Sequence, residues 1–363
     1  MTSSPPSSAA ARHWKLDRPL WGLSPNRRGD WALGALGDGA LVVVPSSDTG
    51  APPRLIAGHQ GVSLEIAADA DDHAFLSGGD DGRLLLVDPQ IDVPTLLAEH
   101  AGKWIDHVAS SSEGLRAYAI GKMLYRLDDA AQEYAPPLTL PSSIGGLAFS
   151  PDGQLLAISH YGGVSVLSCK KPLKAPTLLP WKGSHLSLLW SPDGQFLLSS
   201  MQDGAVHGWL FQGGVPSPEE GREMHMQGYE TKIASMRFTT GGKYLATSGA
   251  AQVVCWPFGG EGPWDKSPLM LGGAEARLVG HVAPHPVDPV VAAGYDDGMV
   301  ILAPLDGRME IMIHPPVAAR GAGVVGMVWS GEGDGLVVGL ENGHLLLFTH
   351  SSIAGFVRGR FGG

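Results

Sequence analysis

The strongest constraint in this sequence is an internal repeat, because a unit of three apolar stretches separated by two turns recurs eight times between Trp14 and Phe348. The clearest copies begin at Gly145 and Ser187 and read GGLAFSPDGQLLAISHYGGVSVLS and SLLWSPDGQFLLSSMQDGAVHGWL. Each contains Ser-Pro-Asp-Gly, in which Pro fixes φ at one corner of a β-turn and Asp and Gly tolerate the next positions. The pattern therefore predicts three strands in each unit.

The second turn of each unit gives the period. Its second residue falls at eight positions separated by 40 to 47 residues: Gly39, Gly82, Lys122, Gly163, Gly204, Ala251, Gly298 and Gly343. Asp-Gly and Asn-Gly between apolar runs are strong hairpin signals, because both residues accept a positive φ. A period of this length with several strands per period predicts a β-propeller.

A fourth strand is expected before each unit. The candidates are residues 14–16, 54–57, 95–98, 137–140, 177–179, 223–226, 276–279 and 310–313. No further strand is expected after Phe348, so the N-terminal strand is predicted to pair with the last sheet and close the ring, which removes exposed sheet edges. The expected fold is all-β, a single propeller of eight four-stranded blades. It would have seven if the Pro-rich segment 282–289 prevents its unit from forming a sheet.

These repeats resemble the WD40-repeat family over nearly the whole chain. Gly-His, which precedes the first strand in that family, occurs as Gly58-His59 and Gly280-His281, while the family's Trp-Asp ending is replaced by pairs such as Val87-Asp88. The resemblance implies that His59 and His281 are structural histidines that form hydrogen bonds within the blade. For His59, the residues that match the family's network are Ser77 and Asp81. The resemblance also implies a rigid ring that holds a partner and does no chemistry.

The repeat indicates one domain over residues 13–350. Residues 1–12 and 351–363 are expected to be flexible tails, because the first is rich in Ser, Pro and Ala and the second in Gly, Ser and Arg. The N-terminal segment lacks the apolar core of a signal peptide. No apolar run reaches the roughly 18 residues that would span a membrane.

Composition limits the partners. The net charge is −11 and no run of Lys or Arg exceeds two residues, so nucleic acid is not an expected partner. Cys169 and Cys255 fall in units that are not adjacent and are expected to be reduced thiols. We therefore expect a cytoplasmic, monomeric protein without a membrane contact.

Catalytic motifs are missing from the sequence. It contains neither Gly-x-Ser-x-Gly nor a Walker-type phosphate loop, and zinc spacing signatures are also missing. One alternative stays open, in which His160 and His185 hold zinc or calcium between neighbouring blades at the channel mouth, with a small ligand or an enzymatic activity. The acidic cluster of Asp69, Asp71 and Asp72 lacks the pattern of an EF-hand and is expected to be a solvated hairpin tip.

Aromatic residues beside the connections are the better candidates for recognition, because Trp and Tyr dominate interface hot spots. Five are expected on the face formed by the leading connections and second turns, and a sixth lies in the long connection 258–273: Trp104, Tyr161, Trp181, Tyr229, Tyr295 and Trp264. The sequence thus favours a non-catalytic scaffold that needs no cofactor and binds a protein or peptide on one propeller face.

Overall fold

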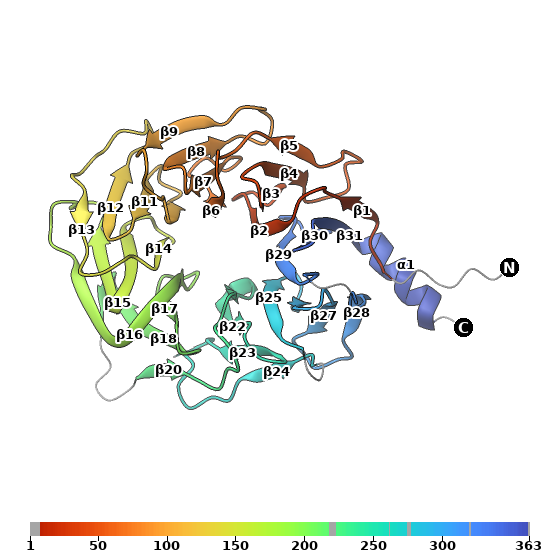
Figure 1. The fold of residues 1–363 in the computed structure, drawn as a ribbon. Helices are drawn as coiled ribbons and strands as arrows, with labels where there is room; N and C mark the ends of the chain where they lie inside the picture. Colours follow the sequence, from red (N-terminus) through yellow and green to blue (C-terminus); the bar gives the residue numbers. More distant parts are fainter. Residues whose placement is uncertain (1–7, 218–222, 261, 274–276, 319–320, 362–363) are drawn as a thin grey trace.

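The computed structural model describes residues 8–217, 223–260, 262–273, 277–318 and 321–361. It is a ring of antiparallel sheets that follow one another around a central channel (Figure 1). The strands of the described residues form seven hydrogen-bonded sheets, six with four strands and one with seven. The seven-stranded sheet contains two blades, so the ring has the eight four-stranded units that the repeat predicts.

The first three blades are formed in chain order. Blade 1 contains β2 (Leu20–Pro25), β3 (Trp31–Leu36), β4 (Leu41–Pro45) and β5 (Arg54–Ile56). Blade 2 contains β6 (Ser63–Ala68), β7 (Phe75–Gly79), β8 (Arg83–Val87) and β9 (Thr95–Glu99). Blade 3 contains β10 (His107–Ser110), β11 (Arg116–Ile120), β12 (Met123–Leu127) and β13 (Leu138–Thr139). In each blade the first strand lies at the channel and the fourth at the outer rim.

Blades 4 and 5 share one continuous sheet. It contains β14 (Gly146–Phe149), β15 (Leu155–Ser168), β16 (Thr177–Trp190), β17 (Phe196–Met201), β18 (Val206–Gln212), β19 (Val215–Pro216) and β20 (Met224–Met226). The chain reverses within β15, where Gly162 and Gly163 have positive φ and Cys169 N donates to Gln154 O. Residues 177–180 of β16 form the outer strand of blade 4, and residues 185–190 form the inner strand of blade 5.

The last three blades complete the ring. Blade 6 contains β21 (Met236–Phe238), β22 (Tyr244–Thr247), β23 (Val253–Pro257) and β24 (Leu269–Leu271), with a short 3-10 helix, η1 (Thr240–Gly242), in its first turn. Blade 7 contains β25 (Val279–Pro284), β26 (Val290–Tyr295), β27 (Val300–Pro304) and β28 (Ile311–His314). Blade 8 contains β29 (Val324–Trp329), β30 (Gly335–Leu340), β31 (His344–Thr349) and β1 (Arg12–Lys15).

The predicted closure is confirmed. β1 pairs antiparallel with β31, so that Trp14 lies opposite Leu345 and Lys15 opposite His344. The Pro-rich seventh unit also forms its own sheet. The expected outer strand at 276–279 is wrong, however: β24 takes that place in blade 6, Val279 begins β25, and residue 276 lies outside the described residues.

The two termini are more ordered than expected over the described residues. Ala9 is buried and its N–H donates to Ile313 O at 2.8 Å, whereas residues 1–7 lie outside the described part. The C-terminal segment forms a helix, α1 (His350–Phe361). Ile353 and Phe356 share one face of this helix at a spacing of three and pack on the apolar cluster of blades 7 and 8. Burial of those two side chains explains why this Gly- and Ser-containing segment is not a flexible tail.

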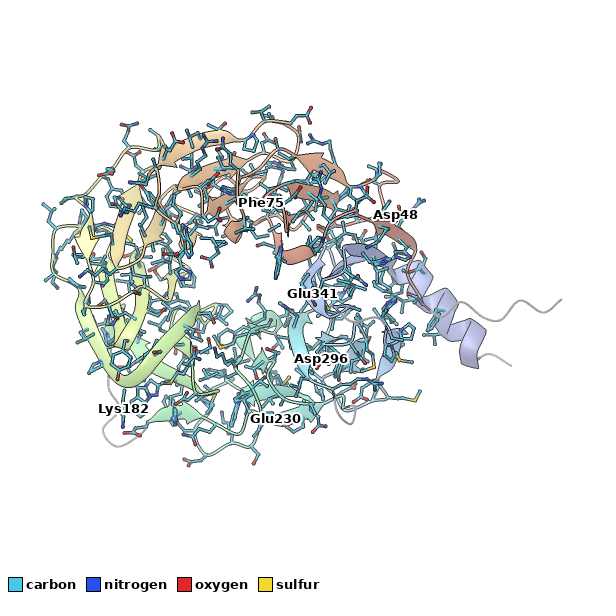
Figure 2. The ribbon with its side chains drawn as sticks, viewed as in Figure 1. Asp48, Phe75, Lys182, Glu230, Asp296 and Glu341 are labelled. Atoms are coloured by element: carbon cyan, nitrogen blue, oxygen red, sulfur yellow. The ribbon has the colours of Figure 1, made fainter. Side chains whose placement is uncertain are left out.

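The core lies between neighbouring blades rather than within one. Leu33 and Val43 of blade 1 pack against Phe75 and Val87 of blade 2 in one apolar cluster. Figure 2 shows side chains filling the spaces between adjacent sheets all around the ring, with Phe75 labelled in blade 2. Each sheet thus buries both faces against its neighbours. This explains why many middle strands, such as β4 and β30, are buried along their whole length.

Close backbone packing at the second turns leads to our first prediction. Gly39 has φ of 84°, and a Cβ atom there would lie 1.9 Å from Gly61 O. Gly50 has a similar φ of 77° but nothing within 4 Å of its Cβ position. We expect Gly39→Ala to lower the free energy of unfolding by about 3 kcal/mol and Gly50→Ala by about 1 kcal/mol, because only the first adds a clash to the left-handed backbone. Urea unfolding checks both, and equal losses would contradict the assigned packing.

Candidate binding surface

One end of the ring is formed by the connections between blades and by the second turns, and we call it the connection face. Backbone hydrogen bonds join the two: His59 N donates to Gly39 O at 2.9 Å and His100 N to Gly82 O at 2.8 Å. Two acidic residues labelled in Figure 2 repeat the pattern, because Asp296 N donates to Leu278 O and Glu341 N to Gly323 O. These bonds hold the second turns of blades 1 and 2 against the connection after the blade, and those of blades 7 and 8 against the connection before it.

Two of the predicted aromatic residues stand exposed on this face. The side chain of Trp104 is 62% exposed in the connection between blades 2 and 3, and that of Tyr161 is 66% exposed at the second turn of blade 4. Sequence reasoning missed a third, Trp21, which is 61% exposed at the start of β2. The pairing of β2 with β3 is irregular between Leu20 and Gly22, so Trp21 occupies a β-bulge. That bulge leaves no local signature that would have identified Trp21.

Tyr295 belongs to the interior, and Tyr229 is half-buried with its hydroxyl bonded within the blade. Tyr295 is 0% exposed and packs in the core cluster of blades 6 and 7, so it cannot meet a partner. The expectation that it lines a docking face is therefore withdrawn. The hydroxyl of Tyr229 is hydrogen-bonded to Thr247 Oγ1 and accepts from Trp256 Nε1, both at 2.8 Å. Burial raises its pKa to about 12, as expected for a phenol held in the blade.

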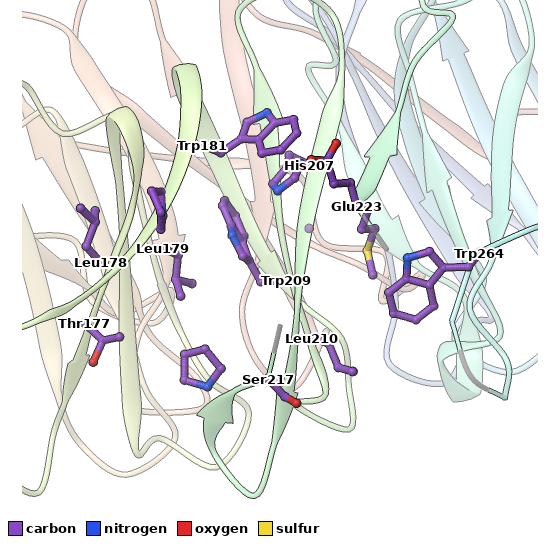
Figure 3. A pocket seen from close by; sticks show the side chains of 14 residues that line it. Thr177, Leu178, Leu179, Trp181, His207, Trp209, Leu210, Ser217, Glu223 and Trp264 are labelled. Carbon is purple, nitrogen blue, oxygen red and sulfur yellow. The ribbon is translucent and has the colours of Figure 1, made fainter. Parts of the chain in front are cut away.

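The remaining two predicted aromatic residues, Trp181 and Trp264, line a cavity of about 470 Å³ on the outer rim, which we call the rim cavity (Figure 3). It lies at blade 5 and not at the channel mouth. Its wall is formed by residues 177–181 of β16, by 207–210 of β18, by 216–217, 223 and 224, and by Trp264 from the loop between β23 and β24 of blade 6. In Figure 3, Trp181 and His207 lie at one end, with Thr177 and Leu178 along one side and Trp264 on the opposite side.

The local fold explains why the aromatic side chains meet at the rim cavity. His207 and Trp209 are two residues apart on β18 and so project from the same face. Trp181 stacks on His207 with ring centroids 3.7 Å apart and planes 14° apart, and Trp209 meets the same ring edge-on at 4.7 Å. His225 of β20 lies directly opposite His207 in the sheet register. The cavity end is thus formed by packed rings.

The electrostatics of the rim cavity are simple. Glu223 is exposed and is the one carboxylate among the described lining residues, which include neither Lys nor Arg. Burial, reinforced by the charges of His225 and His185, lowers the pKa of His207 to about 3, so its imidazole is neutral at pH 7. The buried atoms His207 Nδ1, His225 Nδ1 and Trp264 Nε1 have no hydrogen-bond partner among the described residues. A ligand that brings hydrogen-bond acceptors would complement such nitrogens.

Tyr161 lies on the strand that pairs with the Trp181 segment. In the sheet register it is opposite Ser184, three residues after Trp181, and Lys182 between them is exposed. Tyr161 does not itself line the rim cavity, so a partner that contacted both would extend from the cavity onto the connection face. Trp104 and Trp21 belong to blades 1 to 3 and lie outside this surface.

The two histidines considered as metal ligands already have hydrogen-bond partners within the protein. His160 uses Nε2 with Ser165 Oγ and Nδ1 with Tyr161 O, both at 2.9 Å. His185 uses Nδ1 with Ser199 Oγ and Nε2 with Trp181 O, both at 3.1 Å. Over the described ranges no group of three or more His, Cys, Asp or Glu side chains is arranged to hold a metal ion. This geometry gives the zinc or calcium alternative no support.

The histidine network of blade 2 is as predicted. His59 Nε2 is hydrogen-bonded to Ser77 Oγ at 2.8 Å, and His59 Nδ1 to Asp81 Oδ1 at 2.9 Å. His281 does not repeat this arrangement. It lies opposite Gly294 within the inner strand, the place that Glu65 takes opposite Gly78 in blade 2. The assignment of His281 as a structural histidine of the connection is therefore wrong.

The acidic cluster after β6 also differs from expectation. Asp69 is 0% exposed and forms two hydrogen bonds with Arg116 of blade 3, Oδ1 with Nε at 2.7 Å and Oδ2 with Nη2 at 2.8 Å. Asp71 and Asp72 are exposed, as a hairpin tip would be. The sequence cannot reveal the pair, because its partners lie 47 residues apart. Cys169 and Cys255 are free thiols, as expected.

Comparison with known proteins identifies one of the repeats of this chain. Residues 182–209, which contain the inner strand of blade 5, β17 and most of β18, match the family model described as WD domain, G-beta repeat. No curated protein matches the chain. None of the helices within the described residues is long and apolar enough to cross a membrane. The matched repeat and the ring of four-stranded antiparallel blades fit a WD40-type β-propeller.

Proposed function

We propose that this propeller is a non-catalytic scaffold that binds a peptide segment of a protein partner along blade 5, with an apolar side chain of the peptide in the rim cavity. The observation that carries the proposal is the aromatic lining of that cavity by Trp181, Trp209 and Trp264. A volume of about 470 Å³ is in the usual range for ligand pockets. Aromatic side chains that meet in one pocket are the usual anchors of such interfaces.

Two further features favour a peptide over a purely apolar ligand. The unpaired ring nitrogens of His207 and Trp264 belong to residues that line the cavity, and a peptide carbonyl group that displaced the atoms covering them would supply an acceptor. Glu223 at the cavity favours a peptide with a basic residue beside its apolar anchor, and the net charge of −11 acts in the same direction. The partner would then extend across Tyr161 onto the connection face.

The test uses a library of random peptides displayed on phage, selected on the purified protein. Affinities of the enriched peptides are measured by fluorescence polarisation for wild type and for Tyr161→Ala. We expect Tyr161→Ala to weaken binding at least tenfold, about 1.4 kcal/mol, and to leave thermal unfolding unchanged because the side chain is 66% exposed. Trp181→Ala is expected to weaken binding further.

Trp21→Ala is the matched control, because Trp21 is similarly exposed but belongs to blade 1. It should bind the same peptides as wild type. Peptides that bind Tyr161→Ala and Trp181→Ala as tightly as wild type, or that require Trp21 instead, would overturn the assignment of blade 5. Trp104→Ala in the same series shows how far a partner extends over the connection face.

A further inference from the structure

A second cavity, of about 480 Å³, opens at the opposite end of the channel from the connection face. We call it the channel pocket. It is lined by the first turns of blades 1, 7 and 8 and by the inner strands of blades 1, 6, 7 and 8. Three arginines and one histidine contribute to its wall, and none of the residues that line it is Asp or Glu: Arg27, Arg28, Arg237 and His281. The net charge of this wall is positive, whereas the net charge of the whole chain, with 36 acidic and 25 basic residues, is negative.

Arg237 lines this pocket from the inner strand of blade 6. It lies on β21, is open to the channel, and is surrounded by the neighbouring blades. Its Nη1 donates to Met236 O at 2.8 Å, and this is the one hydrogen bond of its guanidinium among the described residues. No carboxylate of the described chain forms an ion pair with it, and burial alone lowers its pKa. A guanidinium has five N–H donors, so most of them remain available.

His281 adds a neutral donor beside Arg237. Burial and, to a smaller extent, the charge of Arg237 lower the pKa of His281 to about 4, so the ring carries one N–H at neutral pH. Both residues are on inner strands of adjacent blades, β21 and β25, and line the same pocket. An anion placed between them would meet a full positive charge and a second donor.

The other two arginines supply charge rather than free donors. Arg27 is fixed across the first turns of blades 2 and 3, because its Nε donates to Asp69 O at 2.6 Å and its Nη2 to Ser110 O at 2.7 Å. Burial lowers the pKa of Arg27 despite the nearby Asp69 and Asp72. Arg28 contacts the ring of His73. Both guanidiniums are thereby held at the first-turn end of the channel.

We propose that the channel pocket binds a phosphate-bearing anion, with Arg237 as its direct ligand and His281 as a second donor. Arg237 has no charged partner among the described residues, and a phosphate group offers two negative charges and several acceptor oxygens to its free donors. This inference goes beyond the peptide site on blade 5, because it concerns another surface and another ligand chemistry. The phosphate comes either from a small phosphate compound or from a phosphorylated side chain of a partner.

The test measures thermal unfolding and isothermal titration with sodium pyrophosphate, against sodium chloride at equal ionic strength. Pyrophosphate is expected to raise the melting temperature of wild type with increasing concentration. Arg237→Met should abolish that rise and weaken the measured affinity at least tenfold, and Arg237→Lys should retain part of it.

Arg308→Met is the matched control, because Arg308 is 82% exposed and pairs with Asp306 away from the pocket. A phosphoserine peptide and its unphosphorylated form are titrated in the same way to distinguish the two sources. Arg237-dependent binding of the phosphopeptide alone assigns the phosphate to a modified partner chain, of pyrophosphate alone to a small compound, and of both to either source. A pyrophosphate response that persists in Arg237→Met, or that Arg308→Met also loses, would refute the site. No response of wild type to pyrophosphate or to phosphopeptide would refute it as well.

Discussion

Asp69→Ala is expected to destabilise the protein by about 3 to 5 kcal/mol, the range for breaking a buried ion pair by removing one partner. Asp69 is 0% exposed and binds Arg116 through both carboxylate oxygens. The alanine variant would leave a buried guanidinium without its counter-charge. It would also remove a link between blades 2 and 3, because Asp69 belongs to blade 2 and Arg116 to blade 3. Arg116 is fixed in blade 3 by its Nη1, which donates to Asp128 O and Asp129 O. Urea unfolding followed by tryptophan fluorescence measures the loss.

Asp72→Ala is the control for this change, because Asp72 belongs to the same acidic cluster but is exposed. Its effect should stay within about 0.5 kcal/mol, as for other surface substitutions. The double variant Asp69→Leu with Arg116→Met should recover most of the stability, because it removes both charges together. Equal losses for Asp69→Ala and Asp72→Ala would show that the pair does not stabilise the ring.

The architecture could be predicted from the sequence, because a repeated unit indicates both the strands of one blade and the blades that pack beside it. Period, turn residues and a spare strand at Trp14 led to eight blades and to the pairing of β1 with β31. What failed was local assignment by short motifs. Gly280-His281 matches the family dipeptide, yet strand register places His281 inside the channel, because hydrogen-bonded pairing determines position and a dipeptide does not.

The candidate sites were less predictable, because each one gathers residues from several blades. Trp181, Trp209 and Trp264 meet at the rim cavity from two blades and a long connection, and no spacing in the sequence indicates that meeting. The channel pocket around Arg237 could not be predicted for the same reason, because its lining residues come from blades 6, 7, 8 and 1. The net charge of −11, which argued against a nucleic-acid partner, also hides this local basic wall.

Acid is expected to destabilise this propeller well above the pH at which its carboxylates titrate. His207 is 4% exposed with a pKa of about 3 when folded, against about 6.5 when unfolded. Between these values the unfolded chain binds a proton that the folded ring rejects, so stability is lost as the pH falls below about 6.5. At pH 5 this one group accounts for about 2 kcal/mol. His281 and His314, whose pKa burial lowers to about 4, act in the same direction.

His207→Phe isolates this contribution, because it keeps an aromatic ring against Trp181 and removes the titrating nitrogens. We expect the fall in unfolding free energy between pH 7.5 and pH 5 to shrink by about 2 kcal/mol in this variant. His350→Phe, at an exposed position, should leave that fall unchanged. An identical acid response in wild type and His207→Phe would exclude His207 as a source. Because the folded ring keeps His207 neutral down to about pH 3, peptide affinity at the rim cavity should not change through this residue between pH 7.5 and pH 5.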